Sequence, residues 1–212
     1  MSRSKRMVKW LFLALFVFLL MKGRIQAWMA LFITSLALSF FIGRFYCGYL
    51  CPIHTGMDGI DWIVSKLHLK RKEPPKWINE SIARILVLFI FVSTFLIVQK
   101  TGQPLPVLPI LFVLGLVLSL IFKPIFFHNY LCPYGALLRF TSKKTKLSYR
   151  LLPEKCIKCG ICKNACPVDA IEMETGKSTP IIDHSACIQC DRCTKNCPQN
   201  ALLLSMRPII SA

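Results

Sequence analysis

Four long apolar runs occupy the first 122 residues of the chain, and each predicts a helix. They extend over Met7–Met21, Ile25–Gly43, Ile82–Val98 and Leu105–Phe122. At about 1.5 Å per residue these helices would be roughly 22 to 29 Å long, close to the bilayer hydrocarbon thickness of about 30 Å. We therefore expect four transmembrane helices. The alternative is a buried helical core, but the chain would have little polar surface to cover it.

The composition is both strongly apolar and strongly basic. Of the 212 residues, 54% are hydrophobic and 17% are charged, and 27 lysines and arginines outnumber 10 acidic residues to give a net charge of +17. This composition excludes a disordered or collagen-like chain. A charge of +17 suits either nucleic acid or an anionic membrane surface, and the hydropathy favours the membrane. We therefore expect a membrane partner and no nucleic acid.

The basic residues are unevenly distributed around the four runs. Most lie before the first run, between the second and third, and after the fourth, whereas the other two connections carry only Lys22, Arg24 and Lys100. Basic loops stay on the cytoplasmic side of a membrane. We therefore expect a multi-pass protein of the cell (inner or cytoplasmic) membrane, with both termini cytoplasmic and the loop around Gly102 external. Lys22, rather than a small-residue cleavage site, ends the first run, which predicts an uncleaved anchor.

Eight of the eleven cysteines form two copies of one motif, C-x2-C-x2-C-x3-C-P, which we call the cysteine repeat. Such close spacing is typical of metal ligands and not of disulfides. Zinc motifs space their pairs further apart and lack the x3-C-P ending, and no histidine follows either C-x-x-C as a c-type haem would need. The first copy contains Cys156, Cys159, Cys162 and Cys166, and the second contains Cys187, Cys190, Cys193 and Cys197.

The two motifs predict two [4Fe–4S] clusters with crossed ligands. Three closely spaced cysteines hold one face of a cubane, and the fourth cysteine of each motif ligates the other cluster. The pattern resembles the bacterial two-cluster ferredoxins over residues 147–206, which implies a small α+β domain. Crossed ligation keeps the clusters close together, which suits electron transfer better than catalysis. One cluster is predicted to bind Cys156, Cys159, Cys162 and Cys197, and the other Cys187, Cys190, Cys193 and Cys166.

A second repeat, which we call the membrane-edge repeat, follows the pairs of apolar runs. RFYCGYLCP (44–52) aligns with IFFHNYLCP (125–133). Because parallel repeats pack around a pseudo-twofold axis, we expect the two motifs to converge at the cytoplasmic membrane edge. Three thiolates and one imidazole would suit a third iron–sulfur cluster or a single tetrahedral metal, and free thiols are the alternative. The residues of this predicted site are Cys47, Cys51, His128 and Cys132.

The segments after these motifs carry candidates for a quinone site. Residues 53–69 have apolar side chains at helical spacing, which predicts an amphipathic helix at the membrane interface. His54 and Trp62 lie in this segment, and Tyr134 follows the second motif. The three side chains are candidates to line a quinone headgroup, and simple membrane anchoring is the alternative.

Together these features resemble the NapH/NosR-type membrane ferredoxins over nearly the whole chain. The resemblance rests on the four apolar runs, the C-x3-CP motifs and the C-terminal motif pair, and the sequence departs from it at His128. It implies an α-helical membrane protein with four transmembrane helices and a small α+β bacterial 2[4Fe–4S] ferredoxin-like domain. Residues 1–146 would form the membrane domain, with its motifs at 44–52 and 125–133, and residues 147–212 the cytoplasmic two-cluster domain.

The resemblance implies the electron-transfer subunit of a membrane oxidoreductase complex. Electrons would pass through the two clusters between a cytoplasmic redox partner or complex subunit and an acceptor at the membrane edge. That acceptor is a quinone, a third metal site or another membrane subunit. Two alternatives stay open: a cupric reductase or metal-site assembly factor, and a regulatory or maturation protein that senses redox state. The sequence leaves the oligomeric state and the pathway open.

Overall fold

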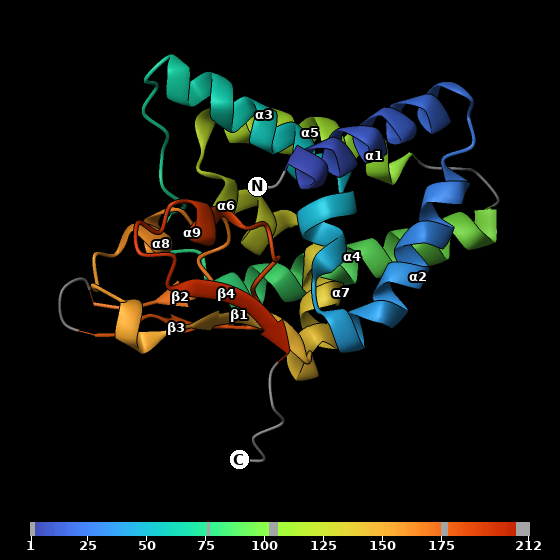
Figure 1. The fold of residues 1–212 in the computed structure, drawn as a ribbon. Helices are drawn as coiled ribbons and strands as arrows, with labels where there is room; N and C mark the ends of the chain where they lie inside the picture. The colour runs from blue at the N-terminus through green and yellow to red at the C-terminus, as the bar shows by residue number, and fades with distance from the viewer. Residues whose placement is uncertain (1–2, 76, 102–105, 175–177, 207–212) are drawn as a thin grey trace. The chain divides into compact units, whose positions relative to one another are not determined.

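The computed structural model describes residues 3–75, 77–101, 106–174 and 178–206 (Figure 1). The loop predicted around Gly102 and the last six residues lie outside the described residues. Contacts within the chain divide it into two compact units, one of Met1–Cys51 with Leu138–Ala212 and one of Pro52–Leu137. The domain boundary that the sequence predicts between residues 146 and 147 stays a prediction.

The first unit begins with two apolar helices. α1 covers Arg3–Met21 and α2 covers Gln26–Ile42. The ring of Trp28 on α2 packs edge-on against a phenylalanine of α1, with 5.3 Å between the ring centroids. Its indole N–H donates a 2.8 Å hydrogen bond to the hydroxyl of Tyr46, which opens the π-helical turn η1 (Tyr46–Leu50). Trp28 therefore connects both helices to the turn that follows them.

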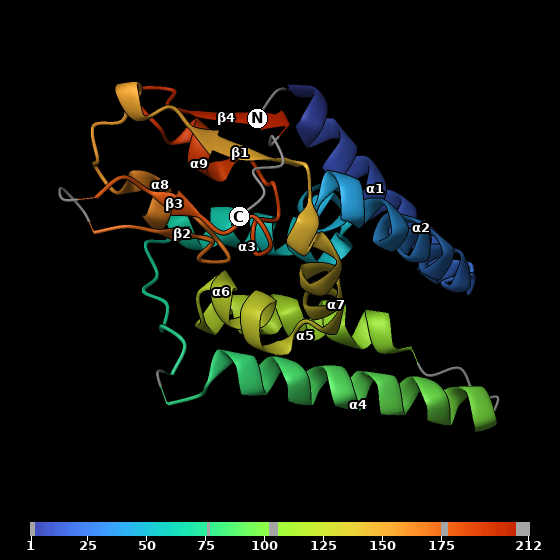
Figure 2. The same ribbon diagram turned by 90° about the horizontal axis from the view of Figure 1, so that it is seen from below.

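The rest of the first unit is a small α+β region of short elements. They are α7 from Leu138 onward, η3 (Ser142–Lys144), β1 (Leu147–Leu151), η4 (Pro153–Lys155), α8 (Ile161–Asn164), β2 (Ile171–Glu172), β3 (Ile181–Ile182), α9 (Arg192–Lys195) and β4 (Leu202–Met206). Strand β1 pairs antiparallel with β4, and β2 pairs antiparallel with β3 (Figure 2). Because Leu147 lies opposite Met206, the longer ladder joins the beginning of this region to its end.

The second unit is helical within the described residues. Its elements are α3 (Pro52–Lys66), α4 (Glu80–Thr101), α5 (Val107–Ile121), α6 (Pro124–Phe126), η2 (Phe127–Leu131) and the start of α7 (Pro133–Thr141). α3 is the helix that the sequence predicts over residues 53–69. It lies beside α5 (Figures 1 and 2) at a spacing that two glycines allow. A β-carbon on Gly56 would lie 2.8 Å from Leu116, and one on Gly115 would lie 2.8 Å from Ile53.

The prediction of four transmembrane helices is wrong. Among the described residues, a single stretch, Glu80–Val98 in α4, is both long enough and apolar enough to cross a membrane. α2 and α5 are apolar but have 17 and 15 residues, so at about 1.5 Å per residue they are shorter than a hydrocarbon core of about 30 Å. α1 has 19 residues, but four of its first seven are basic.

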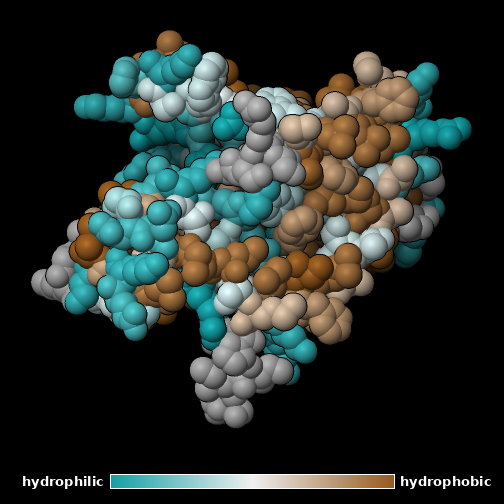
Figure 3. All heavy atoms as spheres, viewed as in Figure 1, coloured by the Kyte–Doolittle hydropathy of each residue, from teal (hydrophilic) through white to brown (hydrophobic). Residues whose placement is uncertain are grey.

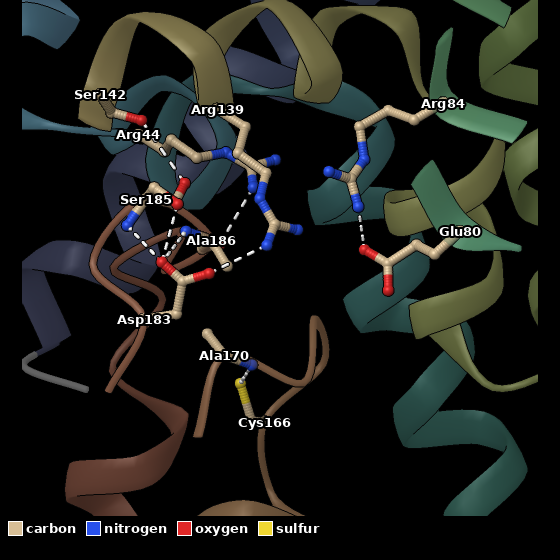
Figure 4. Close-up of polar contacts among 10 residues, drawn as sticks. All are labelled: Arg44, Glu80, Arg84, Arg139, Ser142, Cys166, Ala170, Asp183, Ser185 and Ala186. Carbon is tan, nitrogen blue, oxygen red and sulfur yellow. Dashed lines mark hydrogen bonds and ion pairs between the residues drawn. The ribbon is translucent and has the colours of Figure 1, made fainter. Parts of the chain in front are cut away.

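The backbone shortens two of the predicted runs. The second run loses Gly43, which adopts a positive φ of 80° directly after α2 ends. The fourth run is cut at both ends, because α5 begins after Pro106 and the chain is extended at Phe122. α4 keeps its length, and the charge of Arg84 near its start is paired with Glu80 one turn earlier (Figure 4).

Candidate iron–sulfur centre

The two C-terminal cysteine motifs fold as two copies of one loop. In each copy the closely spaced cysteines run into a single helical turn, α8 or α9. Positive φ angles recur at equivalent positions, 55° at Lys158 and 58° at Gln189, then 77° at Gly160 and 63° at Asp191. Residues other than glycine rarely adopt a positive φ, and such backbone strain concentrates at functional sites. Because the two loops have the same backbone conformation, each loop wraps around a centre of its own.

Each loop borders a cavity lined by four cysteines. The two cavities are equal in size. In each, three cysteines come from one motif and the fourth comes from the other motif, as crossed ligation requires. The structure thus brings together both ligand sets that the sequence predicts. The first cavity contains Cys156, Cys159, Cys162 and Cys197, and the second contains Cys166, Cys187, Cys190 and Cys193.

The cysteines surround a space and do not converge on a point. Among the described residues, no group of three or more His, Cys, Asp or Glu side chains is placed to hold a metal ion. A zinc ion needs its thiolates at about 2.3 Å from one centre, whereas the four thiolates of a cubane bind separate iron atoms. The arrangement therefore fits [4Fe–4S] clusters better than zinc.

A backbone N–H group supports one sulfur atom in each cavity. The N–H of Ala170 donates to Cys166 Sγ (Figure 4), and the N–H of Ala201 donates to Cys197 Sγ, both at 3.3 Å. The two bonds are equivalent in the cysteine repeat. Each fixes the cysteine that crosses to the other loop, and hydrogen bonds to ligating sulfurs help to set a cluster's reduction potential.

Burial and neighbouring thiols disfavour ionisation of cysteines in the second cavity. Burial is the main cause that raises the pKa of Cys187 to about 12, and the neighbouring Cys190 adds to it. Burial also raises the pKa of Cys193 far above its usual range, with Cys187 adding to it. Because the thiolate is the ligand form, four thiolates in this cavity need a bound cationic group. The irons of a [4Fe–4S] cluster would supply that charge.

Both cysteine sets pack against one hydrophobic core. Its buried members are Tyr149, Cys162, Ile171, Met173, Ile182 and Leu202, and partly buried Cys166, Cys187, Cys193 and Cys197 lie against them. A hydrophobic shell restricts water and tunes the potential of a metal site. One shared core also keeps the two sites adjacent, which electron transfer between them requires.

The second loop is held by the first membrane-edge motif, residues 44–52. Arg44 Nη1 donates to the carbonyl of Ala186 at 3.0 Å (Figure 4), and its Nη2 lies 3.9 Å from Cys47 Sγ. The hydroxyl of Tyr49 donates to the carboxylate of Asp191 at 3.1 Å. Burial, together with the Asp191 charge, raises the pKa of Tyr49, so the hydroxyl keeps its proton. A cation and a phenol of this motif thus bind the loop that carries the second cysteine set.

Backbone meets backbone in the same contact. Gly48 in η1 leaves no room for a β-carbon, which would overlap the carbonyl oxygen of Ile188. The side-chain amide of Gln189 donates at 2.6 Å to the last carbonyl of α2. Lys5 on α1 forms an ion pair with Asp191 at 2.6 Å. The second loop is therefore fixed by α1, by the end of α2 and by η1.

The same loop is also anchored from the C-terminal side of the first unit. The carboxylate of Asp183 accepts hydrogen bonds from the N–H groups of Ser185 and Ala186 at 2.9 and 3.3 Å, and from Arg139 at 2.9 Å (Figure 4). Burial opposes ionisation of Asp183, but the Ser185 hydrogen bond and the Arg139 charge outweigh it and hold the pKa below its usual range. The charged carboxylate therefore fixes the entry to the second loop.

Sequence reasoning missed Arg44 and Asp191, although both carry a readable signal. In the membrane-edge repeat, Arg44 stands where the second copy has Ile125. In the cysteine repeat, Asp191 stands where the first copy has Gly160, at a left-handed position that glycine fills without strain. A polar residue that breaks an internal repeat marks a contact made by one copy alone.

Arg44 is predicted to raise the reduction potential of the second cluster. Its side chain is buried and its charge acts on Cys187. A positive charge in a low-dielectric site favours the more negative, reduced form of a neighbouring group. Arg44→Gln should therefore lower the midpoint potential of this cluster alone, as measured by a redox titration followed by EPR. Arg150→Gln removes the same charge from an exposed position on β1 and is the control. Equal shifts in the two variants would contradict this role.

The two membrane-edge motifs have the same backbone, although they lie in different units. Each contains a π-helical turn, η1 or η2, and each turn precedes a helix that begins with proline. The N–H of Cys51 donates to the carbonyl of Tyr46 at 2.8 Å, and the N–H of Cys132 donates to that of Phe127 at 2.9 Å. Single π turns are rare and occur frequently at functional sites. The membrane-edge repeat is therefore a repeat of structure as well as of sequence.

In the second motif, a histidine pair accompanies the cysteine. His128 Nε2 and His54 Nδ1 lie 3.2 Å apart, and both side chains are buried. His54 Nε2 lies 3.7 Å from the carboxylate of Asp58. Cys132 Sγ accepts the N–H of Gly135 at 3.3 Å, at the start of α7. A helix N-terminus favours the thiolate form of a cysteine, so this position suits a ligand.

The residues of the predicted membrane-edge site are divided between the two units. Cys47 and Cys51 belong to the first unit, and His128 and Cys132 belong to the second. All four side chains are buried. Their convergence stays a prediction.

The three quinone candidates all lie in the second unit and have different environments. His54 and Tyr134 are buried, whereas Trp62 is exposed. The ring of Tyr134 packs edge-on against Phe91 with 5.2 Å between centroids, and the ammonium of Lys66 lies 4.1 Å from the ring centre of Trp62. Each residue thus has a packing partner of its own, and the quinone site stays a prediction.

Two family descriptions match this chain. A 4Fe-4S dicluster domain matches residues 155–201, which contain all eight cysteines of the two cavities. A 4Fe-4S binding domain matches residues 25–72 and again residues 104–150. The second description therefore covers both copies of the membrane-edge repeat. No solved structure matches the chain.

Three relatives are similar to about two thirds of the chain. Uncharacterized protein MJ0749 of Methanocaldococcus jannaschii is 32% identical over 152 residues, which are 68% of this chain and 60% of that protein. Uncharacterized protein MJ0750 of the same organism is 26% identical and is covered over 69% of its length. "Putative electron transport protein YccM" of Escherichia coli is 25% identical over 66% of this chain and 45% of its own length. The chain thus spans less than two thirds of MJ0749 and less than half of YccM.

These similarities establish the cofactors of the protein. The chain contains a 4Fe-4S dicluster domain and two copies of a 4Fe-4S binding domain, and it therefore has two [4Fe–4S] clusters. None of the relatives carries a NapH or NosR name. The narrower resemblance to that group is therefore not established.

Proposed function

We propose that this iron–sulfur electron-transfer protein is bound to a membrane and connects a redox partner protein to an acceptor at the membrane surface. The acceptor is a quinone, a third metal site or another membrane subunit. One observation carries the proposal: the unit that holds both cysteine cavities also contains two apolar helices with exposed side chains. An electron carrier with an apolar anchor fits that combination.

Exposed apolar side chains in the first unit support membrane binding. They gather over α1 and α2 on the face shown in Figure 3, whereas the region of α8 and α9 is more hydrophilic. Large contiguous apolar surfaces mark contacts with lipid or with other proteins. The exposed residues on these helices include Met7, Trp10, Leu11, Leu15, Phe18, Met21, Ile33, Leu38, Phe40 and Phe41.

In the second unit, α4 supports the same proposal. No part of the apolar stretch Glu80–Val98 is buried within the protein. Lys100 follows it, and Arg84 near its start is neutralised by Glu80. An apolar stretch of this length with no buried residue fits a lipid environment.

The proposed orientation places both termini and the ferredoxin region on the cytoplasmic side of the cell membrane, so α4 enters the membrane from that side and does not separate the two parts of the first unit. The distribution of lysine and arginine along the sequence supports it, since basic segments are retained in the cytoplasm. The narrower proposal, an electron-transfer subunit of a membrane oxidoreductase complex related to the NapH/NosR-type proteins, rests on the sequence motifs.

The chain's own residues have defined roles in this proposal. The cysteines bind the two clusters, each of which supplies a site for one electron. Backbone N–H groups at Ala170 and Ala201 orient the crossing sulfurs, and the core around Tyr149 restricts water. Arg44 adds a buried positive charge beside the second set.

Membrane binding is tested by a charge placed on α4. Phe89→Arg puts a cation in the middle of the apolar stretch, where it costs about 2.5–3.5 kcal/mol during insertion. We expect less protein in carbonate-washed membranes. Trp77→Arg is the matched control, because Trp77 is also exposed but lies outside the stretch. Release of the native protein into the carbonate wash would contradict membrane anchoring.

A third metal site at the membrane-edge motifs, as the sequence predicts it, is part of the proposal. The match of a 4Fe-4S binding domain to both copies of the repeat supports it, as do the π-helical turns. Anaerobically purified protein should then contain about twelve irons per chain, or a further metal beside the eight irons that two cubanes need. Cys132→Ala should remove the additional metal. Eight irons with no other metal, and unchanged electron transfer in Cys132→Ala, would contradict this site.

A further inference from the structure

The two cluster loops are equivalent by sequence but differ in what covers them. Ile157 in the first loop corresponds to Ile188 in the second, since each directly follows the first cysteine of its motif. Ile157 is 59% exposed, whereas Ile188 is 1% exposed. Likewise Cys159 is exposed, and its counterpart Cys190 is buried. One face is therefore open in the first loop and closed in the second.

The closed face of the second loop is covered by the chain itself. Gly48 of η1 meets the backbone of Ile188, and Arg44 binds the carbonyl of Ala186. Tyr49 and Lys5 hold Asp191. This loop already has an internal docking partner, so it offers no such face to another protein.

The open face of the first loop has the composition of a docking site. Ile157 and Ile161 expose apolar side chains on either side of Cys159. Lys155 is exposed and Lys158 is partly exposed, and both line the first cavity. An apolar centre with a charged rim is typical of protein interfaces. A cysteine of the predicted cluster reaches the surface in the middle of this face.

The charge of this face selects the kind of partner. Residues 154–163 contain one acidic residue, Glu154, and three lysines. The third lysine, Lys163, donates to the carbonyl of Met173 and stays beside the loop. Complementary charge steers protein association and raises its rate. A partner with an acidic surface fits this rim.

We propose that the face formed by Lys155, Ile157, Lys158, Cys159 and Ile161 docks an acidic redox protein, while η1 occupies the equivalent face of the second loop. This inference rests on the proposed electron-transfer function. It sets the order in which an electron passes through the two clusters. One electron passes between the partner and the first cluster, and no bond is made or broken. The second cluster then lies on the side of the membrane-edge motif within the same unit.

The test measures how fast an acidic redox protein reduces the clusters. Fully reduced flavodoxin, an acidic one-electron donor, serves as the probe in stopped-flow experiments on the purified chain in detergent. The rate of the native protein should fall as salt rises, because screening weakens charge steering. Lys155→Glu and Ile157→Ser should each slow the reaction at low salt, Lys155→Glu by about tenfold. Lys146→Glu and Leu203→Ser, which change exposed residues outside this loop, are the matched controls.

Dithionite, a small reductant that needs no docking face, distinguishes a failure of the docking proposal from a failure of the electron-transfer proposal. Dithionite should reduce the native protein and all four variants equally, which shows that the clusters are intact. If flavodoxin then reduces Lys155→Glu as fast as the native protein, the proposed docking face is wrong and electron transfer stands. If dithionite cannot reduce the native protein, the electron-transfer function fails and this inference fails with it.

Discussion

Gly48→Ala is expected to destabilise the protein and to loosen the second cluster. The new β-carbon would overlap the carbonyl oxygen of Ile188, which lies in the loop between two predicted ligands, Cys187 and Cys190. Adding a methyl group to a packed site costs about 1–3 kcal/mol. Here the strain falls on backbone, so the loop must move away from η1. Thermal unfolding should occur at lower temperature, and the EPR signal of the second cluster should broaden or disappear.

Gly59 provides the matched control for this substitution. It lies within α3, and a β-carbon there meets nothing within 4 Å. Alanine at a compatible helical position stabilises by about 0.4–1 kcal/mol, so Gly59→Ala should unfold at the same or a higher temperature. Equal destabilisation by both variants would contradict the contact between η1 and the second loop.

Cys166→Ser is expected to destroy a cluster whose other ligands all belong to the second motif. Cys166 ends the first motif but lines the second cavity. Crossed ligation therefore predicts that the second cluster is lost or converted to a three-iron form. EPR and iron analysis should show a first cluster that is unaffected.

A double-variant comparison identifies which cluster is lost. Cys190→Ser removes a ligand of the second cluster only. Adding Cys166→Ser to it should cause little further loss of iron, whereas adding Cys162→Ser should remove the first cluster as well. Changes at one shared site are not additive, and changes at separate sites are. Additive loss with Cys166→Ser would mean that each motif binds its own cluster.

The cysteine loops could be predicted from the sequence because their chemistry is local. A run of closely spaced ligands restricts the backbone to a tight wrap, and the cysteine repeat indicates two such wraps. The structure shows the same positive φ at Lys158 and Gln189 and equivalent N–H···S bonds at Ala170 and Ala201. Likewise the membrane-edge repeat reappears as two π-helical turns.

The number of membrane-spanning helices could not be predicted from hydropathy. A hydropathy sum treats Gly43 and Phe122 as parts of apolar runs, but the backbone leaves the helix at both residues. It also treats α1 as a span, although four of its first seven residues are basic. Helix length depends on where the dihedral angles change, and a hydropathy window contains no such information.

The long-range contacts likewise could not be predicted from the sequence. The cover over the second loop joins Arg44 to Ala186 and Gly48 to Ile188, so each pair connects the N-terminal part of the chain to its C-terminal part. No local sequence pattern predicts either contact, because a glycine in a turn or a buried arginine occurs in proteins for many different reasons. The difference between the open and the closed face therefore became visible only in the folded chain.

A redox titration of the anaerobically purified chain in detergent, followed by EPR and iron analysis, tests the central account most directly. The account predicts that each set of four cysteines holds one cluster and takes up one electron, two per chain. The two signals should interact magnetically, because both sets pack against one core. A chain whose cysteine sets bind no iron, or bind iron that takes up no electrons, would contradict it.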